Sequence, residues 1–193
     1  MHSIQKRLRF VQFRLPQKNW RVCILLSRRR ADGSGEVSLP HVTITFMERI
    51  TRSLDEFGRV AADFALRIKP CRSGATVIGL CGELGAGKTA FVQAAARALG
   101  VTETLTSPTF LIFKKYQLPV TSSSYRSLVH ADAYRLKNSE ELRKLRFNEL
   151  LADPDNLIFV EWADRVADML PSHRILLTIA ALDDQTRAVT VSP

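Results

Sequence analysis

The feature that most constrains the fold is an eight-residue loop of the form G-x-x-x-x-G-K-[ST], Gly82-Glu83-Leu84-Gly85-Ala86-Gly87-Lys88-Thr89. The apolar, β-branched run at residues 76–81 precedes the loop and predicts a buried strand. The alanine-rich run at residues 90–99 follows it and predicts a helix. A strand, this loop and a helix in that order form a phosphate-binding unit, so we expect an α/β domain that binds a nucleoside triphosphate.

Each residue type in the loop has a chemical reason. Glycines let the backbone turn so that successive N–H groups point at phosphate oxygens, and the helix N-terminus adds partial positive charge. Lys88 is expected to reach the β and γ phosphates, and the Thr89 hydroxyl is expected to ligate Mg²⁺. The loop residues expected to contact the nucleotide are Glu83, Leu84, Gly85, Ala86, Gly87, Lys88, Thr89 and Ala90.

Positive charge is concentrated at the start of the chain. The net charge is +9, and residues 1–46 carry nine Lys and Arg against only Asp32 and Glu36. The rest of the chain carries nineteen bases against seventeen acids. Because this larger part is nearly neutral, the overall charge does not by itself indicate that it binds nucleic acid.

Residues 1–46 show no sustained period of 2 or 3.6, and we interpret them as a basic, largely disordered extension ahead of a P-loop ATPase domain at residues 47–193. Three origins of the extension stay open. It is upstream sequence ahead of a true start at Met47, a functional basic arm, or an organelle transit segment.

The compartment and metal content follow from the remaining composition. The three cysteines have no C-x-x-C spacing, which favours a reducing compartment, and the four histidines have no metal-ligand spacing. The longest apolar runs are far shorter than the roughly 18 residues of a membrane span. We therefore expect a cytoplasmic protein with no membrane partner.

Regular patterning becomes strong from Ser53, where Ser53-Leu54-Asp55-Glu56 has the spacing of a capping box. One face of the helix that follows is expected to pack on the sheet, and this face consists of Leu54, Phe57, Ala61, Phe64, Ala65 and Ile68. Gly100 is expected to end the helix after the loop, and Ser139 to begin a later helical stretch. The further strands are expected at 110–118, 128–132, 157–161, 174–180 and 187–192. The pattern predicts a three-layer α/β P-loop NTPase sandwich with a mostly parallel central sheet and a C-terminal β-hairpin.

Two of these strands end in acids. Residues 157–161 form an apolar strand that ends in Glu161, the arrangement of a Walker B strand, and residues 128–132 end in Asp132. Ligands of such sheets bind outside the carboxyl ends of the strands, so both acids are able to converge on the loop. Alternatively, each acid caps the segment that follows it. Thr109, in the extended turn after Pro108, is placed to reach Mg²⁺ or the γ phosphate, but its spacing alone leaves that role undecided.

Four ordered blocks carry a resemblance to a known family. They are the loop at 82–89, Thr106-Ser107-Pro108-Thr109-Phe110, His130-Ala131-Asp132-Ala133-Tyr134-Arg135-Leu136, and Val160-Glu161-Trp162. Together they resemble the bacterial TsaE family, formerly called YjeE, over about residues 50–180. These are small ATPases needed to make threonylcarbamoyladenosine in tRNA.

The resemblance implies specific roles. The residues to which it gives catalytic roles are Lys88, Thr109, Asp132 and Glu161. It implies that Thr89 and Glu161 hold Mg²⁺, that Thr109 is a switch residue, and that Trp162 lies beside the bound ATP. It also implies action on the TsaB–TsaD complex, tRNA contact only through that complex, and weak ATPase activity in the absence of the partner.

The chain departs from the family pattern at two positions. Glu83 stands where Asp or Asn is usual, and Arg146 replaces a common glycine, which puts the turn there and its partner contacts in doubt. The loop is also compatible with two other functions. A small-molecule or nucleotide kinase would need an arginine-rich lid, and a nucleic-acid-binding module would use the basic arm with a regulatory ATP site.

Overall fold

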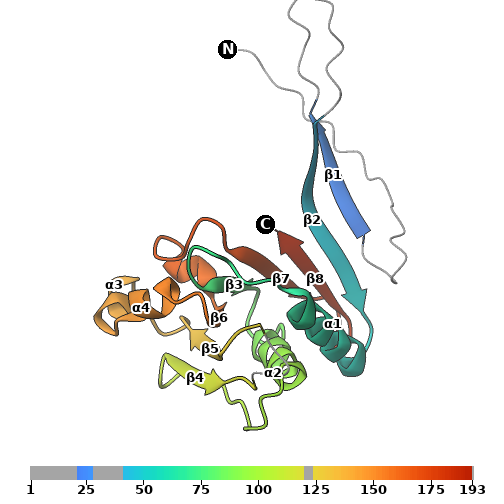
Figure 1. Ribbon diagram of the computed structural model, residues 1–193. Helices are drawn as coiled ribbons and strands as arrows, with labels where there is room; N and C mark the ends of the chain where they lie inside the picture. Colours follow the sequence, from blue (N-terminus) through green and yellow to red (C-terminus); the bar gives the residue numbers. More distant parts are fainter. Residues whose placement is uncertain (1–20, 28–40, 120–123, 193) are drawn as a thin grey trace, which may run out of the picture.

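The computed structural model describes residues 21–27, 41–119 and 124–192. Its middle layer is one eight-stranded sheet in the order β1-β2-β8-β7-β3-β6-β5-β4 (Figure 1). The strands are β1 Arg21–Ser27, β2 His41–Thr51, β3 Thr76–Cys81, β4 Phe113–Gln117, β5 Ser127–Asp132, β6 Asn156–Glu161, β7 Ile175–Ala181 and β8 Arg187–Ser192. The helices are α1 Leu54–Arg67, α2 Lys88–Ala98, α3 Glu140–Lys144, α4 Phe147–Ala152 and the 3₁₀ helix η1 Ala163–Val166.

The centre of the sheet is parallel and its flanks are antiparallel. β3 pairs in parallel with β6 and β7, and β6 pairs in parallel with β5. β7 and β8 form the expected C-terminal antiparallel hairpin, and β4 runs antiparallel to β5 at the far edge. The predicted fold class is confirmed, with its parallel part confined to the four central strands.

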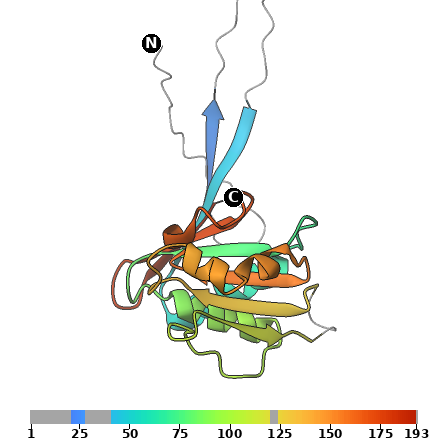
Figure 2. The ribbon, with the colours of Figure 1, turned by 90° about the vertical axis from the view of Figure 1, so that its left-hand side faces the viewer.

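Helices cover both faces of this sheet. α1 and α2 lie on one face, and α3, α4 and η1 lie on the other (Figures 1 and 2). The alternation of side chains along β3 and β6 explains the two cores. Ile78 and Phe159 pack with α1 and α2, whereas Val77 and Ile158 pack with the opposite helices. Among the described residues, no helix is long and apolar enough to cross a bilayer.

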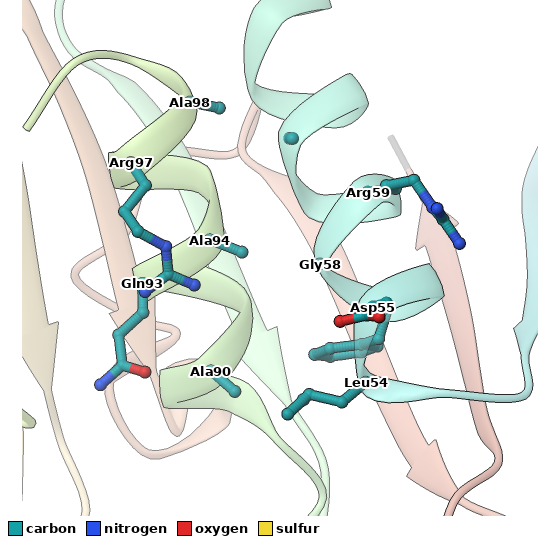
Figure 3. Close-up of a pocket in the computed structure, with 11 residues that line it drawn as sticks. Leu54, Asp55, Gly58, Arg59, Ala90, Gln93, Ala94, Arg97 and Ala98 are labelled. Atoms are coloured by element: carbon teal, nitrogen blue, oxygen red, sulfur yellow. The ribbon is translucent and has the colours of Figure 1, made fainter.

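The start of α1 is capped as the sequence predicts. The Ser53 hydroxyl accepts a hydrogen bond from the Glu56 N–H at 3.1 Å, and the Glu56 carboxylate accepts one from the Arg52 N–H at 2.9 Å. The expected buried face of α1 needs one correction. Leu54 is 75% exposed and does not belong to it, whereas Val60 is fully buried and does. Leu54 lies in the first turn, at the rim of a groove between α1 and α2 rather than over the sheet (Figure 3).

Gly100 ends α2 as expected. Its φ of +90° is left-handed, and the N–H groups of Gly100 and Val101 donate to the carbonyls of Arg97 and Ala96. These two bonds form a Schellman motif, which satisfies carbonyls left free at the helix end.

The N-terminal part of the chain contains β1 and the start of β2, where the sequence predicted a largely disordered extension. β1 lies inside residues 1–46, and β2 crosses the 46/47 boundary to pair Met47–Thr51 with β8. β1 and the start of β2 form a ribbon that projects from the body (Figures 1 and 2). Residues 41–46 alternate between apolar and polar types, a short strand pattern that the basic composition of the extension obscured. Residues 1–20 and 28–40, which the same prediction covers, lie outside the described residues.

Arg146, the residue that replaces a common glycine, divides the later helical stretch into α3 and α4. Its φ is +60°, a left-handed conformation that costs a residue with a Cβ atom free energy and costs glycine almost none. Its guanidinium pairs with Glu149, but both side chains are exposed, so the pair contributes little.

We therefore expect Arg146→Gly to raise the free energy of unfolding by about 0.5–1 kcal/mol in urea titrations. Arg143→Gly is the matched control, because Arg143 lies within α3 and its replacement is expected to cost about 1 kcal/mol. A loss of stability in Arg146→Gly as large as in Arg143→Gly would show that the left-handed backbone is not a source of strain.

Candidate nucleotide-binding site

The loop between β3 and α2 has a backbone that requires glycine at two positions. Gly82 has a φ of +141°, and a Cβ atom there would lie 2.2 Å from the Ile179 carbonyl oxygen of β7. Gly87 has a φ of +108° and is the N-cap of α2. The loop therefore packs closely on the sheet and presents the N-terminus of α2, where backbone N–H groups favour an anion.

Lys88 lies folded inside this loop. Its Nζ donates to the carbonyl oxygens of Gly82 at 2.7 Å and Glu83 at 2.9 Å, and it stands 3.7 Å from the centroid of the Trp162 ring. Burial lowers the pKa of Lys88 from its ordinary value, while the carboxylates of Glu161 and Asp132 act in the opposite direction. The ammonium is thus a mostly desolvated donor whose neighbouring carbonyls can be exchanged for phosphate oxygens.

Glu161 connects the loop to the sheet. One carboxylate oxygen accepts a hydrogen bond from the Thr89 hydroxyl at 3.0 Å, and the other lies 2.7 Å from His130 Nε2. Glu161 is only 3% exposed, so both of its oxygens depend on these two protein donors. The predicted pair Thr89 and Glu161 is therefore in direct contact.

Asp132 holds the segment that contains Thr109. Its Oδ2 accepts hydrogen bonds from the hydroxyls of Thr109 at 2.7 Å and Ser107 at 3.0 Å, and its Oδ1 accepts one from the Tyr134 N–H at 2.9 Å. Next to this segment, Ile112 has a φ of +67°, which is rare for a β-branched residue. The turn at Phe110–Ile112 delays the start of β4 to Phe113, three residues later than the sequence suggested.

The two acids lie side by side at the carboxyl edge of the sheet. In the β5–β6 register, Asp132 is directly opposite Glu161. Thr89, Asp132 and Glu161 offer only oxygen atoms, which are the ligands that Mg²⁺ takes. No group of three or more His, Cys, Asp or Glu residues suited to a metal occurs among the described residues.

Trp162 follows Glu161 in a left-handed conformation, with a φ of +57°. This turn brings its ring over Lys88 on one side, and its centroid lies 5.1 Å from that of Tyr134. The Arg165 guanidinium lies 5.5 Å from the Tyr134 ring centroid and 6.0 Å from that of Trp162, and it donates to the Tyr134 carbonyl at 2.7 Å. Trp162 is thus placed beside the loop by a backbone turn that few non-glycine residues adopt.

The remaining predicted loop residues have different surroundings. Leu84 is 78% exposed, and a Cβ atom added to Gly85 would meet nothing within 4 Å. Ala86 is buried, and its carbonyl accepts a hydrogen bond from Arg187 Nε at 3.1 Å. Ala90 lies on the far side of α2, in a groove of about 690 Å³ between α1 and α2 that shares no other residue with the predicted site (Figure 3).

Two residues at the site were not predicted from the sequence. His130 contacts Glu161, and the signal for it was its place two residues before Asp132, on the same face of β5. Arg187 holds the loop at Ala86, from which it is 101 positions away, and no local pattern pointed to it.

Comparisons with known proteins show which family the chain belongs to. The family model described as "Threonylcarbamoyl adenosine biosynthesis protein TsaE" matches residues 51–189. The chain belongs to the TsaE family. The TsaE protein of Rickettsia bellii is 31% identical over 75% of this chain and 94% of its own length. The TsaE protein of Treponema pallidum is 35% identical over 61% of this chain and 82% of its own length. The crystal structure of Bacillus subtilis YdiB matches with a TM-score of 0.61 and 27% identity, over 78% of this chain and 86% of that one.

The Thr109 hydroxyl is testable separately from the acids. If its contact with the charged Asp132, or with a phosphate, supports turnover, Thr109→Val should lower ATP hydrolysis about tenfold, since a hydrogen bond to a charged group contributes about 1.5–3 kcal/mol. Thr109→Ser keeps the hydroxyl and should stay within about threefold of the wild type. Equal rates for the valine and serine variants, measured by phosphate release, would show that the Thr109 hydroxyl does not contribute to hydrolysis.

Proposed function

We propose that this TsaE-family chain binds and hydrolyses ATP with Mg²⁺ and acts on the TsaB–TsaD complex to support its turnover during tRNA threonylcarbamoyladenosine formation. One observation carries the proposal. Asp132 and Glu161 are adjacent at the carboxyl edge of the sheet. Glu161 accepts a hydrogen bond from the Thr89 hydroxyl, and Asp132 accepts one from the Thr109 hydroxyl. The loop supplies Lys88 and the N-terminus of α2 for the phosphates.

The residues divide the chemistry between them. Lys88 and the backbone N–H groups of residues 83–90 would bind the phosphates, with Trp162 beside the nucleotide. Thr89 and Glu161 would hold Mg²⁺, which when bound neutralises charge that builds up on the phosphates. Glu161 and Asp132 are the two acids available to orient the attacking water, because both carboxylates lie at the same edge.

The Thr109 segment supports a dependence on the partner. The Thr109 hydroxyl now donates to Asp132, and a γ phosphate would compete with Asp132 for it, so ATP binding and its loss would switch the segment between two arrangements. Phe110 and Leu111 at its tip are 82% and 69% exposed, so a change there is presented on the surface. Hydrolysis is therefore expected to be weak for the isolated chain and faster with TsaB–TsaD. We also propose that the chain acts in the cytoplasm and contacts tRNA only through the complex.

Membership of the TsaE family favours this function over a small-molecule kinase or a separate nucleic-acid-binding module. The experiment that tests it counts threonylcarbamoyladenosine formed on tRNA per TsaB–TsaD complex, with the full chain and either ATP or a non-hydrolysable analogue. Product is expected to exceed one per complex only with the chain and ATP together. Repeated turnover with the analogue, or without the chain, would contradict the proposal.

A further inference from the structure

We propose that His130 is the positioning residue of Glu161, and that its imidazole sets the direction of the carboxylate toward Thr89 and so the affinity of the site for Mg²⁺. The inference rests on the proposed function, because it assigns His130 a part in the same site. The G-x-x-x-x-G-K-[ST] motif of the loop does not require a histidine at position 130.

The contact itself is short and completely enclosed. His130 is 0% exposed, and its Nε2 lies 2.7 Å from Glu161 Oε1. We assign the hydrogen to Nε2, because the carboxylate form of Glu161 is only able to accept. The other ring nitrogen, Nδ1, is buried and has no hydrogen-bond partner among the described residues. Glu161 is therefore the polar group that fixes the orientation of this ring.

The strand register explains why His130 approaches Glu161 from the interior of the sheet. His130 and Asp132 are two residues apart on β5 and share one face. Asp132 is opposite Glu161 and His130 is opposite Phe159, so His130 lies two residue pairs deeper in the sheet. Glu161 thus receives one hydrogen bond from the sheet interior and one from Thr89 on α2.

Holding both oxygens matters because a glutamate carboxylate is otherwise free to turn. Its terminal torsion is broad and roughly two-fold, so one hydrogen bond does not define its direction. Loss of the His130 donor would also leave Oε1 buried without a partner, which favours any rotation that finds another donor. Residues that orient a metal ligand typically change metal affinity or activity by about 10–100-fold when they are replaced.

Two variants separate positioning from simple packing. His130→Gln places an amide N–H near the position of Nε2, whereas His130→Leu fills the space without any donor. Binding of a fluorescent ATP analogue to the full chain is titrated with Mg²⁺, and thermal unfolding of each variant is recorded without ligand. The leucine variant is expected to need about 10–100-fold more Mg²⁺ for half-maximal binding, and the glutamine variant less than about threefold more.

A second measurement does not depend on nucleotide and covers the case in which a variant fails to fold. In ¹⁵N-histidine spectra of the wild type, His130 is expected to show the Nε2–H form, with its proton shifted downfield of that of the exposed His173. The shift should diminish in Glu161→Gln, whose acceptor is a neutral amide. An Nδ1–H form, or a proton shift that is unchanged in Glu161→Gln, would overturn the inference.

The outcomes distinguish the inference from the function beneath it. If the wild type shows no Mg²⁺-dependent binding of the nucleotide, both the proposed function and the role of His130 are overturned. A wild type that binds, together with a His130→Leu variant that unfolds at lower temperature but keeps the same Mg²⁺ dependence, overturns only the positioning role.

Discussion

Replacing Lys88 by methionine is expected to weaken ATP binding by at least about 100-fold. Its Nζ is the charged donor inside the loop, where it is now bound to two backbone carbonyls. Each hydrogen bond between charged groups contributes about 1.5–3 kcal/mol, so the loss of two bonds to phosphate oxygens would exceed a factor of 100 in affinity. Isothermal titration calorimetry with ATP and Mg²⁺ measures this directly.

The same substitution is expected to leave the nucleotide-free fold intact. Burial lowers the pKa of Lys88 in the folded protein, which means that folding disfavours its charged form at neutral pH. Methionine has a similar volume and no charge to desolvate, so the free energy of unfolding should change by less than about 1 kcal/mol.

Lys114→Met is the matched control for Lys88→Met. Lys114 lies on β4 and forms an exposed ion pair with Glu103 at 3.1 Å. Its loss should leave ATP affinity unchanged, since such surface pairs contribute at most about 1 kcal/mol and lie outside the site. Wild-type affinity in Lys88→Met would contradict the assignment of the loop as the phosphate site.

Glu161→Gln is expected to lower the rate constant of ATP hydrolysis, measured with TsaB–TsaD present, by about 100-fold or more. A positioned acid or base contributes about 10²–10⁴ to a rate, and the amide has neither the charge nor the basicity. Its NH₂ group must also face one of two donors, because Thr89 and His130 both donate to Glu161. ATP binding is expected to change less than turnover, since Lys88 and the loop backbone remain.

Glu103→Gln is the control for this variant, because Glu103 undergoes the same change in an exposed ion pair. Rates are compared at saturating ATP and Mg²⁺, so that any change in affinity does not enter the rate constant. If Glu161→Gln and Glu103→Gln hydrolyse ATP equally fast, Glu161 does not take part in the chemistry.

The sequence was most informative where a local pattern and its chemistry agree. The loop at 82–89, the capping box at Ser53 and the terminating Gly100 are all defined by short-range geometry, and the structure has each of them in place. The positions of Asp132 and Glu161 also followed from the topology, since parallel strands end at one edge of a sheet.

The misses arise from tertiary contacts that no local pattern records. Leu54 fits the apolar period of α1 but lies at the rim of a groove. Arg187 reaches the loop only because β8 returns beside β7. The later helical stretch breaks at Arg146 because one residue turns left-handed, and neither periodicity nor composition carries that information.

The most direct test of the central claim is the rate of ATP hydrolysis by the full chain with Mg²⁺, measured alone and with purified TsaB–TsaD. We expect slow hydrolysis by the chain alone, stimulation by the complex, and loss of that stimulation in Glu161→Gln but not in Glu103→Gln. A rate that the complex does not change, or one that persists in Glu161→Gln, would contradict the account.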